Sequence, residues 1–335
     1  MKQNRNPSAQ VLGEHRIIQL IQGNLTPMPN LPVPLGDDVS AVSLDDKHVS
    51  VLKTDMLVAR TDVPDQMTLF QAARKALIMN ISDFGSKGVQ PTAALVALGL
   101  PKNFAQTDIE EIAKGLNAVA QEYGAYIIGG DTSQTPELII SISLYGTAEK
   151  SALMLRSGAK PGDILAVTGL FGKPAAGLRL LLGDYAASKN CKVLLDSVFM
   201  PNARLIEGLA LSRSGTVSAS MDSSDGLAWS LHELARLSNV GFEVEAVPLA
   251  PEAKQFADLN SLDAAELALY GGEEYELVLT VKPQAWSAAV AAVEAAGGQL
   301  YTIGRVTEQK QVVLKTGGTK TPLEMRGWEH FKSQL

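Results

Sequence analysis

Residues 221–227 (MDSSDGL) bring together side chains whose oxygen atoms suit a hard cation. Asp222 and Asp225 are three residues apart, with two hydroxyl groups and a glycine beside them. Residues 216–221 before them predict a short buried strand, and residues 227–237 after them carry apolar side chains at helical spacing. Carboxylate and hydroxyl oxygens are the ligands that Mg²⁺ takes in proteins, where it keeps several waters. The strand-to-helix turn is therefore a candidate magnesium site.

Similar acidic junctions recur along the chain, beside glycines or at the ends of predicted elements. They contain Asp37, Asp38, Asp55, Asp83 and Asp131. If these carboxylates converge, their repulsion would raise their pKa values unless cations lay among them. Several Mg²⁺ ions could then hold a polyphosphate. Two simpler interpretations stay open: Ser223, Ser224 or Asp225 caps the helix, and the other acids are scattered over solvated turns.

Strands alternating with helices would position these acids, which indicates an α/β or α+β protein. Helices are expected at 11–22, 68–87 and 107–123, the last capped by Thr107, and from residue 201 onward. Strands are expected at 39–44 and 48–52 as a hairpin, then at 92–100, 137–146 and 164–167. Residues 126–128 predict a short buried strand, and a strand at 301–306 ends the expected core. A turn-rich break at 157–163 separates two domains, which we assign to residues 1–149 and 150–335.

Composition excludes several classes of function. The 335 residues are 46% hydrophobic, and their net charge of −7 gives no support to nucleic-acid binding, which usually uses a basic patch. Cys191 is the single cysteine, so neither a disulfide within the chain nor a cysteine zinc cluster is expected. The polar N-terminus does not resemble a signal peptide, and no apolar run of about 18 residues predicts a membrane span. We expect a cytoplasmic protein.

Signatures of other catalytic classes are missing. The sequence has no P-loop, protein-kinase signature, nucleophile elbow or His-Glu-x-x-His segment. Its four histidines lie in separate contexts typical of surface or capping residues. Phosphoryl transfer depends mainly on positioning and electrostatics, and an acceptor that is itself a phosphate needs no general base. We therefore expect no catalytic side chain other than metal ligands and substrate contacts.

Seven motifs occur in the order seen in thiamine-monophosphate kinases, which this chain resembles over nearly its whole length. They are GDDVSAV from Gly36, KTDMLV from Lys53, NISDFGSKG from Asn80, IGGDT from Ile128, RSGAKPGD from Arg156, MDSSDGL from Met221 and GGEEYEL from Gly271. The segments KTDMLVARTDVP and QAARKALIMNISDF look most like the archaeal-type branch. Each motif alone is modest, and their common order is specific.

The resemblance implies ATP-dependent phosphorylation of thiamine monophosphate to thiamine diphosphate by direct transfer. It implies the fold of the aminoimidazole ribonucleotide synthetase superfamily, with an N-terminal α/β domain that dimerises and a C-terminal α+β domain. By this resemblance, the ligands of several Mg²⁺ ions are Asp38, Thr54, Asp55, Asp83, Asp131, Asp222 and Asp225. The ATP contacts are Gly130, Asp131, Arg156 and Ser224, and the substrate contacts are Glu273 and Trp328.

The chain departs from the family pattern at two places. Asp62 stands where many bacterial members have a substrate-contacting histidine, so it either contacts the substrate or caps a loop. Glu274 replaces an aspartate with the same charge. Trp328 either recognises the cationic ring of the substrate or fixes the C-terminal segment to the protein.

Rival members of the superfamily fit the sequence less well. The purine-pathway synthetase would need a G-V-D-G-V-G-T-K-like segment near Lys53, and selenophosphate synthetase an N-terminal reactive cysteine. The hydrogenase maturation relative would need a C-terminal cysteine, whereas this chain ends KSQL. Another ATP-using synthetase, or a nucleotide-binding homologue without catalysis, stays the alternative.

Overall fold

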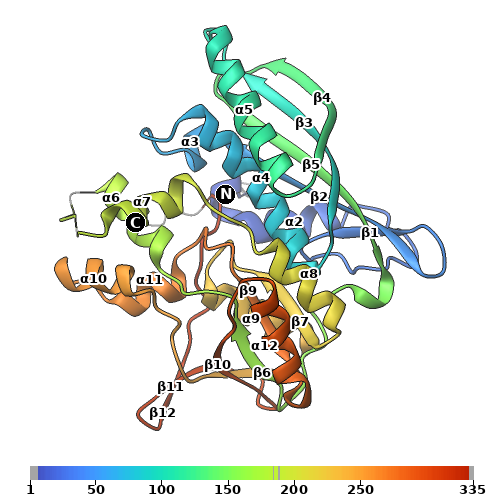
Figure 1. Cartoon of the computed structure of the whole chain (residues 1–335), viewed down its shortest axis with the longest axis vertical. Helices are drawn as coiled ribbons and strands as arrows, with labels where there is room; N and C mark the ends of the chain where they lie inside the picture. Colours follow the sequence, from blue (N-terminus) through green and yellow to red (C-terminus); the bar gives the residue numbers. More distant parts are fainter. Residues whose placement is uncertain (1–6, 184, 188, 332–335) are drawn as a thin grey trace, which may run out of the picture.

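The computed structural model describes residues 7–183, 185–187 and 189–331. Two mixed β-sheets, each covered by helices, follow one another along the chain and form two domains (Figure 1). This is the two-domain arrangement that the alternation of strands and helices predicts. The division at residues 149 and 150 stays a prediction.

The N-terminal sheet has the strand order β1-β2-β5-β3-β4. Its strands are β1 (Ser40–Ser43), β2 (His48–Val58), β3 (Pro91–Leu100), β4 (Tyr126–Gln134) and β5 (Ile139–Glu149). β3 and β4 are parallel, and the other neighbours are antiparallel. Along β2, Val49, Val51 and Leu57 point inward and are buried. Because side chains alternate between faces, Lys53 and Asp55 also lie on this inner face.

Helix α4 (Leu69–Lys87) is the central element of the molecule, and 15 of its 19 residues are buried. It begins with a capping box formed by Thr68 and Gln71 and ends at Gly88 in the left-handed conformation. One side of α4 packs on β2 and β5, and the other contacts α8 (Leu205–Ser214) and β7 (Val217–Asp222). α4 and α8 cross closely, since a Cβ added to Gly208 would lie 2.0 Å from the Gly85 carbonyl oxygen. Residues on α4 can therefore reach both domains.

The C-terminal sheet has the strand order β12-β11-β8-β10-β6-β9-β7. Its other strands are β6 (Ile164–Val167), β8 (Gly241–Val244), β9 (Leu277–Val281), β10 (Tyr301–Thr307), β11 (Val312–Thr316) and β12 (Thr319–Pro322). β7 is an edge strand that contacts α4, which places Asp222 at the junction of the two domains. The remaining helices are α1 (Ala9–Leu12), α2 (Glu14–Gln22), α3 (Ala59–Asp62), α5 (Gln106–Glu122), α6 (Lys173–Leu182), α7 (Cys191–Phe199), α9 (Leu227–Ser238), α10 (Pro251–Leu259), α11 (Ala264–Tyr270) and α12 (Trp286–Ala295).

Several predicted boundaries are wrong for local reasons. The helix expected at 11–22 is divided by Gly13, whose φ of 73° only glycine adopts readily. Thr107 does not cap α5; the Ala105 amide instead donates to the Asp108 carboxylate. The helix expected from residue 201 begins at Leu205.

Two predictions about strands are also wrong. Residues 126–128 belong to the longer edge strand β4, whose side chains are all exposed rather than buried. The core does not end with the strand at 301–306, because β11 and β12 follow as a hairpin. Within the described residues, no helix is both long and apolar enough to cross a membrane.

Candidate active site

Three aspartates from separate parts of the chain meet at the junction of the domains. Asp38 precedes β1, Asp83 lies in the last turns of α4, and Asp222 ends β7. All three are buried, and one carboxylate oxygen from each lies within 4.8 Å of the other two. The convergence predicted from the sequence is therefore correct for these three acids, and the interpretation of them as scattered turn residues is wrong.

The turn after Asp222 does not serve to cap α9. The N-cap of α9 is Gly226, and no side chain makes a capping hydrogen bond there. Ser82 on α4 instead donates to Asp222 Oδ2 over 2.7 Å. The Ser223 hydroxyl is buried and has no partner among the described atoms. The capping interpretation of this turn is wrong, and the Ser223 hydroxyl is available to a ligand.

Two cations fix the Asp38 carboxylate. The Arg156 guanidinium donates from Nε to Asp38 Oδ1 over 2.6 Å. Lys87 is fully buried, and its ammonium lies 2.8 Å from Asp38 Oδ2 and 2.7 Å from Asp37 Oδ1. Lys87 also donates to the Ser220 carbonyl oxygen at 2.6 Å. This lysine therefore connects α4, the loop before β1 and strand β7 through charged hydrogen bonds.

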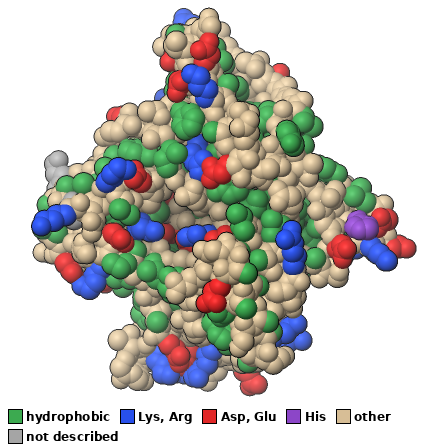
Figure 2. Space-filling view, viewed as in Figure 1, with side chains coloured by type: hydrophobic (Ala, Val, Ile, Leu, Met, Phe, Trp, Pro, Cys, Tyr) green, Lys and Arg blue, Asp and Glu red, His purple; other side chains and the backbone are tan. Residues whose placement is uncertain are grey.

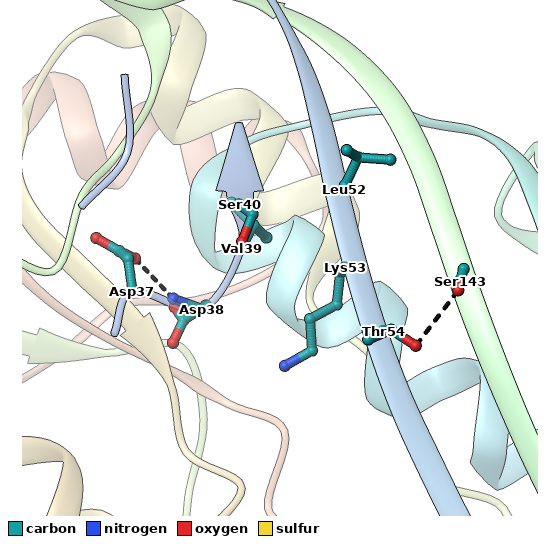
Figure 3. A pocket seen from close by; sticks show the side chains of 8 residues that line it. All are labelled: Asp37, Asp38, Val39, Ser40, Leu52, Lys53, Thr54 and Ser143. Atoms are coloured by element: carbon teal, nitrogen blue, oxygen red, sulfur yellow. Dashed lines mark hydrogen bonds between the residues drawn. The ribbon is translucent and has the colours of Figure 1, made fainter. Parts of the chain in front are cut away.

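A third cation, Lys53, lies beside Asp83 and Asp55. Its Nζ is 2.8 Å from Asp83 Oδ2 and 3.3 Å from Asp55 Oδ1. Asp38, Lys53 and Thr54 line a pocket of about 380 Å³ (Figure 3). The space-filling view shows a hollow near the centre of the molecule with acidic and basic side chains around it (Figure 2).

Burial and mutual repulsion separate the pKa values of these acids. Burial alone would raise the pKa of Asp38, but Arg156 and Lys87 hold it well below its ordinary value. Burial, with a smaller effect of Asp38, raises the pKa of Asp222 to about 6. Burial, Glu14 and Asp222 together raise the pKa of Asp225 to about 7. The pKa of Asp83 is also raised by burial, although Lys53 opposes this. The site carries more negative charge than its own cations stabilise.

The stability of the metal-free protein is expected to fall as pH rises from about 4 to 7. In this window the folded chain binds more protons than the unfolded chain, because Asp222 and Asp225 have raised pKa values. The lowered pKa of Asp38 acts only below this window, where its stabilisation is lost as pH falls. Asp222 alone corresponds to a loss on the order of 3 kcal/mol. Urea unfolding at pH 4 and at pH 7 measures the effect, and saturating Mg²⁺ should remove it. Identical profiles with and without Mg²⁺ would contradict the prediction.

Three of the predicted site residues lie away from the buried cluster. Thr54 points to the outer face of β2, where Ser143 donates to its hydroxyl over 3.3 Å (Figure 3). Asp131 is exposed on edge strand β4 and pairs in register with Ala97 of β3. Gly130 is next to it, and any side chain there would overlap the Val96 carbonyl. Thr54 lines the same pocket as Asp38, whereas within this chain the structure does not bring Gly130 or Asp131 to Asp38 and Asp83.

Two of the predicted substrate residues, Asp62 and Glu273, are connected through a lysine. Lys75 of α4 is buried and forms a short ion pair with Glu273, and it also donates to the Asp62 carbonyl oxygen over 2.8 Å. The Glu273 amide donates to the Ser224 carbonyl oxygen at 2.7 Å. The loop around Glu273 is thus attached to the acidic turn.

Asp62 and Trp328 show contacts that match their simpler interpretations. The Asp62 carboxylate accepts a hydrogen bond from the Val58 amide over 2.7 Å, so this side chain closes the turn around α3. The Trp328 amide donates to the Asp225 carbonyl oxygen over 2.9 Å, which fixes the C-terminal segment to the acidic turn. The indole side chain remains 41% exposed beside this site, so its face can still receive a ring.

Sequence reasoning did not assign the residues that partner the acids: Lys53, Lys75, Ser82 and Lys87. Three of them lie on α4 at positions 75, 82 and 87, close to the helix face that carries Asp83. The signal that could have identified the lysines was their position in a helix that is otherwise apolar. A lysine buried in such a helix requires an acidic or carbonyl partner.

The donor set fits a magnesium ion. Buried carboxylates with raised pKa values need a cation to remain ionised together at neutral pH. Beside Asp222 and Asp83, the Ser223 hydroxyl and the Asn80 side-chain carbonyl are buried without hydrogen-bond partners among the described atoms. Carboxylate, hydroxyl and amide oxygens are ligands of hard cations.

Comparison with known families defines the class of protein. Residues 36–148 match the model of the AIR synthase related protein, N-terminal domain, and residues 160–317 match that of its C-terminal domain. The chain belongs to this family, which confirms the predicted two-domain fold.

The particular branch follows from full-length relatives. Thiamine-monophosphate kinase of Nitrosopumilus maritimus is 34% identical over 322 residues, covering 96% of this chain and 99% of that protein. The enzyme of Pyrococcus horikoshii is 38% identical and covers 89% and 91%. A solved structure described as AaThiL complexed with AMPPCP and TMP superposes with a TM-score of 0.84 at 29% identity, covering 97% and 99%. The chain belongs to the thiamine-monophosphate kinases, as the seven motifs predict, and the predicted enzyme class is confirmed.

Proposed function

We propose that this kinase transfers the γ-phosphoryl group of ATP directly to the phosphate of thiamine monophosphate, with Mg²⁺ bound by Asp38, Asp83 and Asp222. The observation that carries the metal assignment is the buried convergence of these three carboxylates in a chain of this family. Bound Mg²⁺ would neutralise phosphate charge and orient the two phosphate groups. Asp55 and Asp225 are proposed as further ligands, because Asp55 shares the Lys53 ammonium with Asp83 and Asp225 follows Asp222 by three residues.

The protein's own residues would then position the two substrates. Arg156 projects from the start of the C-terminal domain to Asp38, so its guanidinium can contact an ATP phosphate at this junction. Ser224 follows Asp222 directly and is proposed as a second ATP contact. The acceptor phosphate would enter from the side of Glu273. No side chain needs to remove a proton, because the acceptor oxygen is already anionic.

The decisive assay measures transfer of labelled phosphate from ATP to thiamine monophosphate, with free thiamine as the control acceptor. We expect thiamine diphosphate as product, loss of activity with chelator and recovery with Mg²⁺. Full turnover in excess chelator would reject the metal-assisted mechanism. Transfer to thiamine alone would reject the acceptor assignment.

Trp328→Ala is expected to raise the KM for thiamine monophosphate about 5- to 30-fold and to leave the KM for ATP nearly unchanged. The reason is that a half-exposed indole face suits a cationic ring, and a desolvated contact of this kind contributes roughly 1 to 2 kcal/mol. Trp328→Phe, which keeps an aromatic face, serves as the control. Equal weakening of both substrates, or a large fall in melting temperature, would assign Trp328 to structure alone.

We also propose a homodimer that covers the outer face of the N-terminal sheet. Outward side chains there are strongly exposed: Leu52 43%, Met56 54%, Leu95 50%, Tyr126 73% and Tyr145 36%. Contiguous apolar side chains of this kind mark interaction surfaces. A second copy is the proposed occupant because Thr54 and Asp131, both expected from the family resemblance to be metal ligands, lie on the same face.

Leu95→Asp is expected to convert the dimer into a monomer, because it places a charge in the centre of this apolar face. Light scattering should give twice the chain mass of 35.6 kDa for the wild type and the single mass for the variant. Ile109→Asp, on the exposed side of α5, is the control and should remain dimeric. A monomeric wild type would contradict the proposal. The cytoplasmic location stays a prediction.

A further inference from the structure

Lys53 lies in the site but is neither a proposed metal ligand nor a proposed substrate contact. It lies on the inner face of β2 between Val51, which is buried, and Asp55, which is partly exposed. The Lys53 side chain itself is 20% exposed. Figure 3 shows it leaving β2 on the side of Asp38, whereas Thr54 points toward Ser143. Its ammonium is within 3.3 Å of Asp55 Oδ1 and 2.8 Å of Asp83 Oδ2, both of which are proposed metal ligands.

The surroundings of Lys53 differ from those of the neighbouring buried lysine. The Lys87 side chain is fully buried, and its ammonium has three acceptors: Asp37, Asp38 and the Ser220 carbonyl. This satisfies all three donors of an ammonium group and assigns Lys87 to structure. Lys53 has two acceptors, lines the pocket and is partly open to it. One donor direction therefore remains for a group inside the pocket.

We infer that Lys53 is a resident cation of the phosphoryl-transfer site, which pairs with Asp55 and Asp83 before metal binds and contacts the transferred phosphoryl group afterwards. The inference rests on the proposed function. In this reaction the bond between the γ-phosphorus and the bridging oxygen breaks as the acceptor phosphate oxygen bonds to the same phosphorus. Charge spreads over the three remaining γ-oxygens, where a fixed ammonium stabilises the transition state. Lys53 gives up no proton in this step.

The ammonium lies between two carboxylates, 3.3 Å from Asp55 Oδ1 and 2.8 Å from Asp83 Oδ2. The geometry gives this charge two effects of opposite sign. It competes with divalent cations for the oxygens of Asp55 and Asp83, and it assists the reaction once those oxygens have bound metal.

Together these two effects predict lower turnover and tighter metal binding in the same variant. Removal of a residue that only orients the metal ligands would instead weaken metal binding. Lys53→Met should lower the turnover number roughly 10²- to 10³-fold, the usual effect of losing one charge-stabilising group. The same variant should bind Mn²⁺ at least about tenfold more tightly, since a charge only 3 Å from the ligands has been removed. Metal affinity is measured without turnover, by electron paramagnetic resonance of free Mn²⁺ in the absence of nucleotide.

The experiment uses the full chain with three further proteins. Lys53→Gln repeats the test with a polar neutral side chain in case Lys53→Met does not fold. Lys102→Met, on an exposed loop, should keep both wild-type values. Lys53→Arg keeps the charge and should bind Mn²⁺ as weakly as the wild type.

Two results would overturn the inference. The first is normal turnover in Lys53→Met or Lys53→Gln, because Lys53 would then not contact the reacting phosphoryl group. The second is weaker Mn²⁺ binding with turnover restored by excess Mg²⁺, which would make Lys53 an organiser of the metal ligands. Absence of phosphate transfer by the wild-type protein would instead reject the proposed function and is distinguished by this control.

Discussion

Asp222→Asn is expected to lower the turnover number roughly 10²- to 10³-fold at limiting Mg²⁺. Asparagine keeps the shape of the side chain and can still accept the Ser82 hydrogen bond, but it removes one negative charge from the metal site. The fold should not suffer, because burial and the nearby Asp38 already disfavour the ionised form of Asp222. We therefore expect the melting temperature of the metal-free variant to equal or exceed that of the wild type.

Steady-state kinetics over a range of Mg²⁺ concentrations and thermal unfolding without metal measure these effects. Asp196→Asn removes a carboxylate from an exposed pair on α7 and should change neither quantity. Near-normal turnover of Asp222→Asn at limiting Mg²⁺ would show that Asp222 is not a metal ligand. A large fall in melting temperature would show that its charge is structural.

Lys87→Met is expected to destabilise the protein by about 3 to 5 kcal/mol, the usual cost of leaving a buried charge without its partner. Lys87 is enclosed between the two domains, where it pairs with both Asp37 and Asp38. Arg156 would still neutralise Asp38, whereas Asp37 would lose its ion pair. The loss of these ion pairs should therefore lower the free energy of unfolding and loosen the packing between the two domains.

Urea unfolding of the metal-free protein gives this free energy. Lys114→Met is the matched control, because Lys114 forms an exposed ion pair with Glu111 on α5 and should change stability by less than about 1 kcal/mol. Equal effects of the two substitutions would mean that the ion pairs of Lys87 contribute no more than a surface pair.

Apolar spacing was sufficient to predict the helix that carries Asp83. The spacing of residues 68–87 predicts α4 almost to the residue, since it is a local property of the chain, and the structure adds the cap at Thr68. The alternation in residues 48–52 predicts the start of β2, but β2 continues to Val58 through Lys53, Thr54 and Asp55. The predicted strand stopped at Leu52 because these three polar residues interrupt the alternation of apolar side chains.

Burial of β4 could not be predicted from its own residues. Ile127 and Ile128 form an apolar run that is typical of a buried strand, yet β4 is an exposed edge. Burial there depends on a partner surface, which a local pattern does not contain. The hairpin of β11 and β12 was not predicted, although the sequence contains a signal for one. Gly317 and Gly318 separate the two strands as a two-residue turn with positive φ at both positions.

For the site, residue types and spacing were sufficient to predict which acids converge. They did not predict which cations pair with those acids. Asp38, Asp83 and Asp222 converge as expected because all three are tied to α4. Asp83 lies on this helix, Asp222 ends strand β7, which packs on it, and Asp38 pairs with Lys87 at its end. The cations that balance them come from residues distant in sequence: Lys53 lies 30 residues before Asp83, and Lys87 contacts residues 37, 38 and 220. Such pairings depend on the tertiary fold, which periodicity alone does not specify.

The central claim is that Asp38, Asp83 and Asp222 bind the divalent cations that hold ATP against the acceptor phosphate. The most direct measurement is anomalous diffraction at the manganese edge from crystals grown with Mn²⁺, a non-hydrolysable ATP analogue and thiamine monophosphate. We predict at least one anomalous peak in contact with carboxylate oxygens of this cluster and with a phosphate oxygen of the analogue. Bound nucleotide with no anomalous peak at the three carboxylates would contradict it.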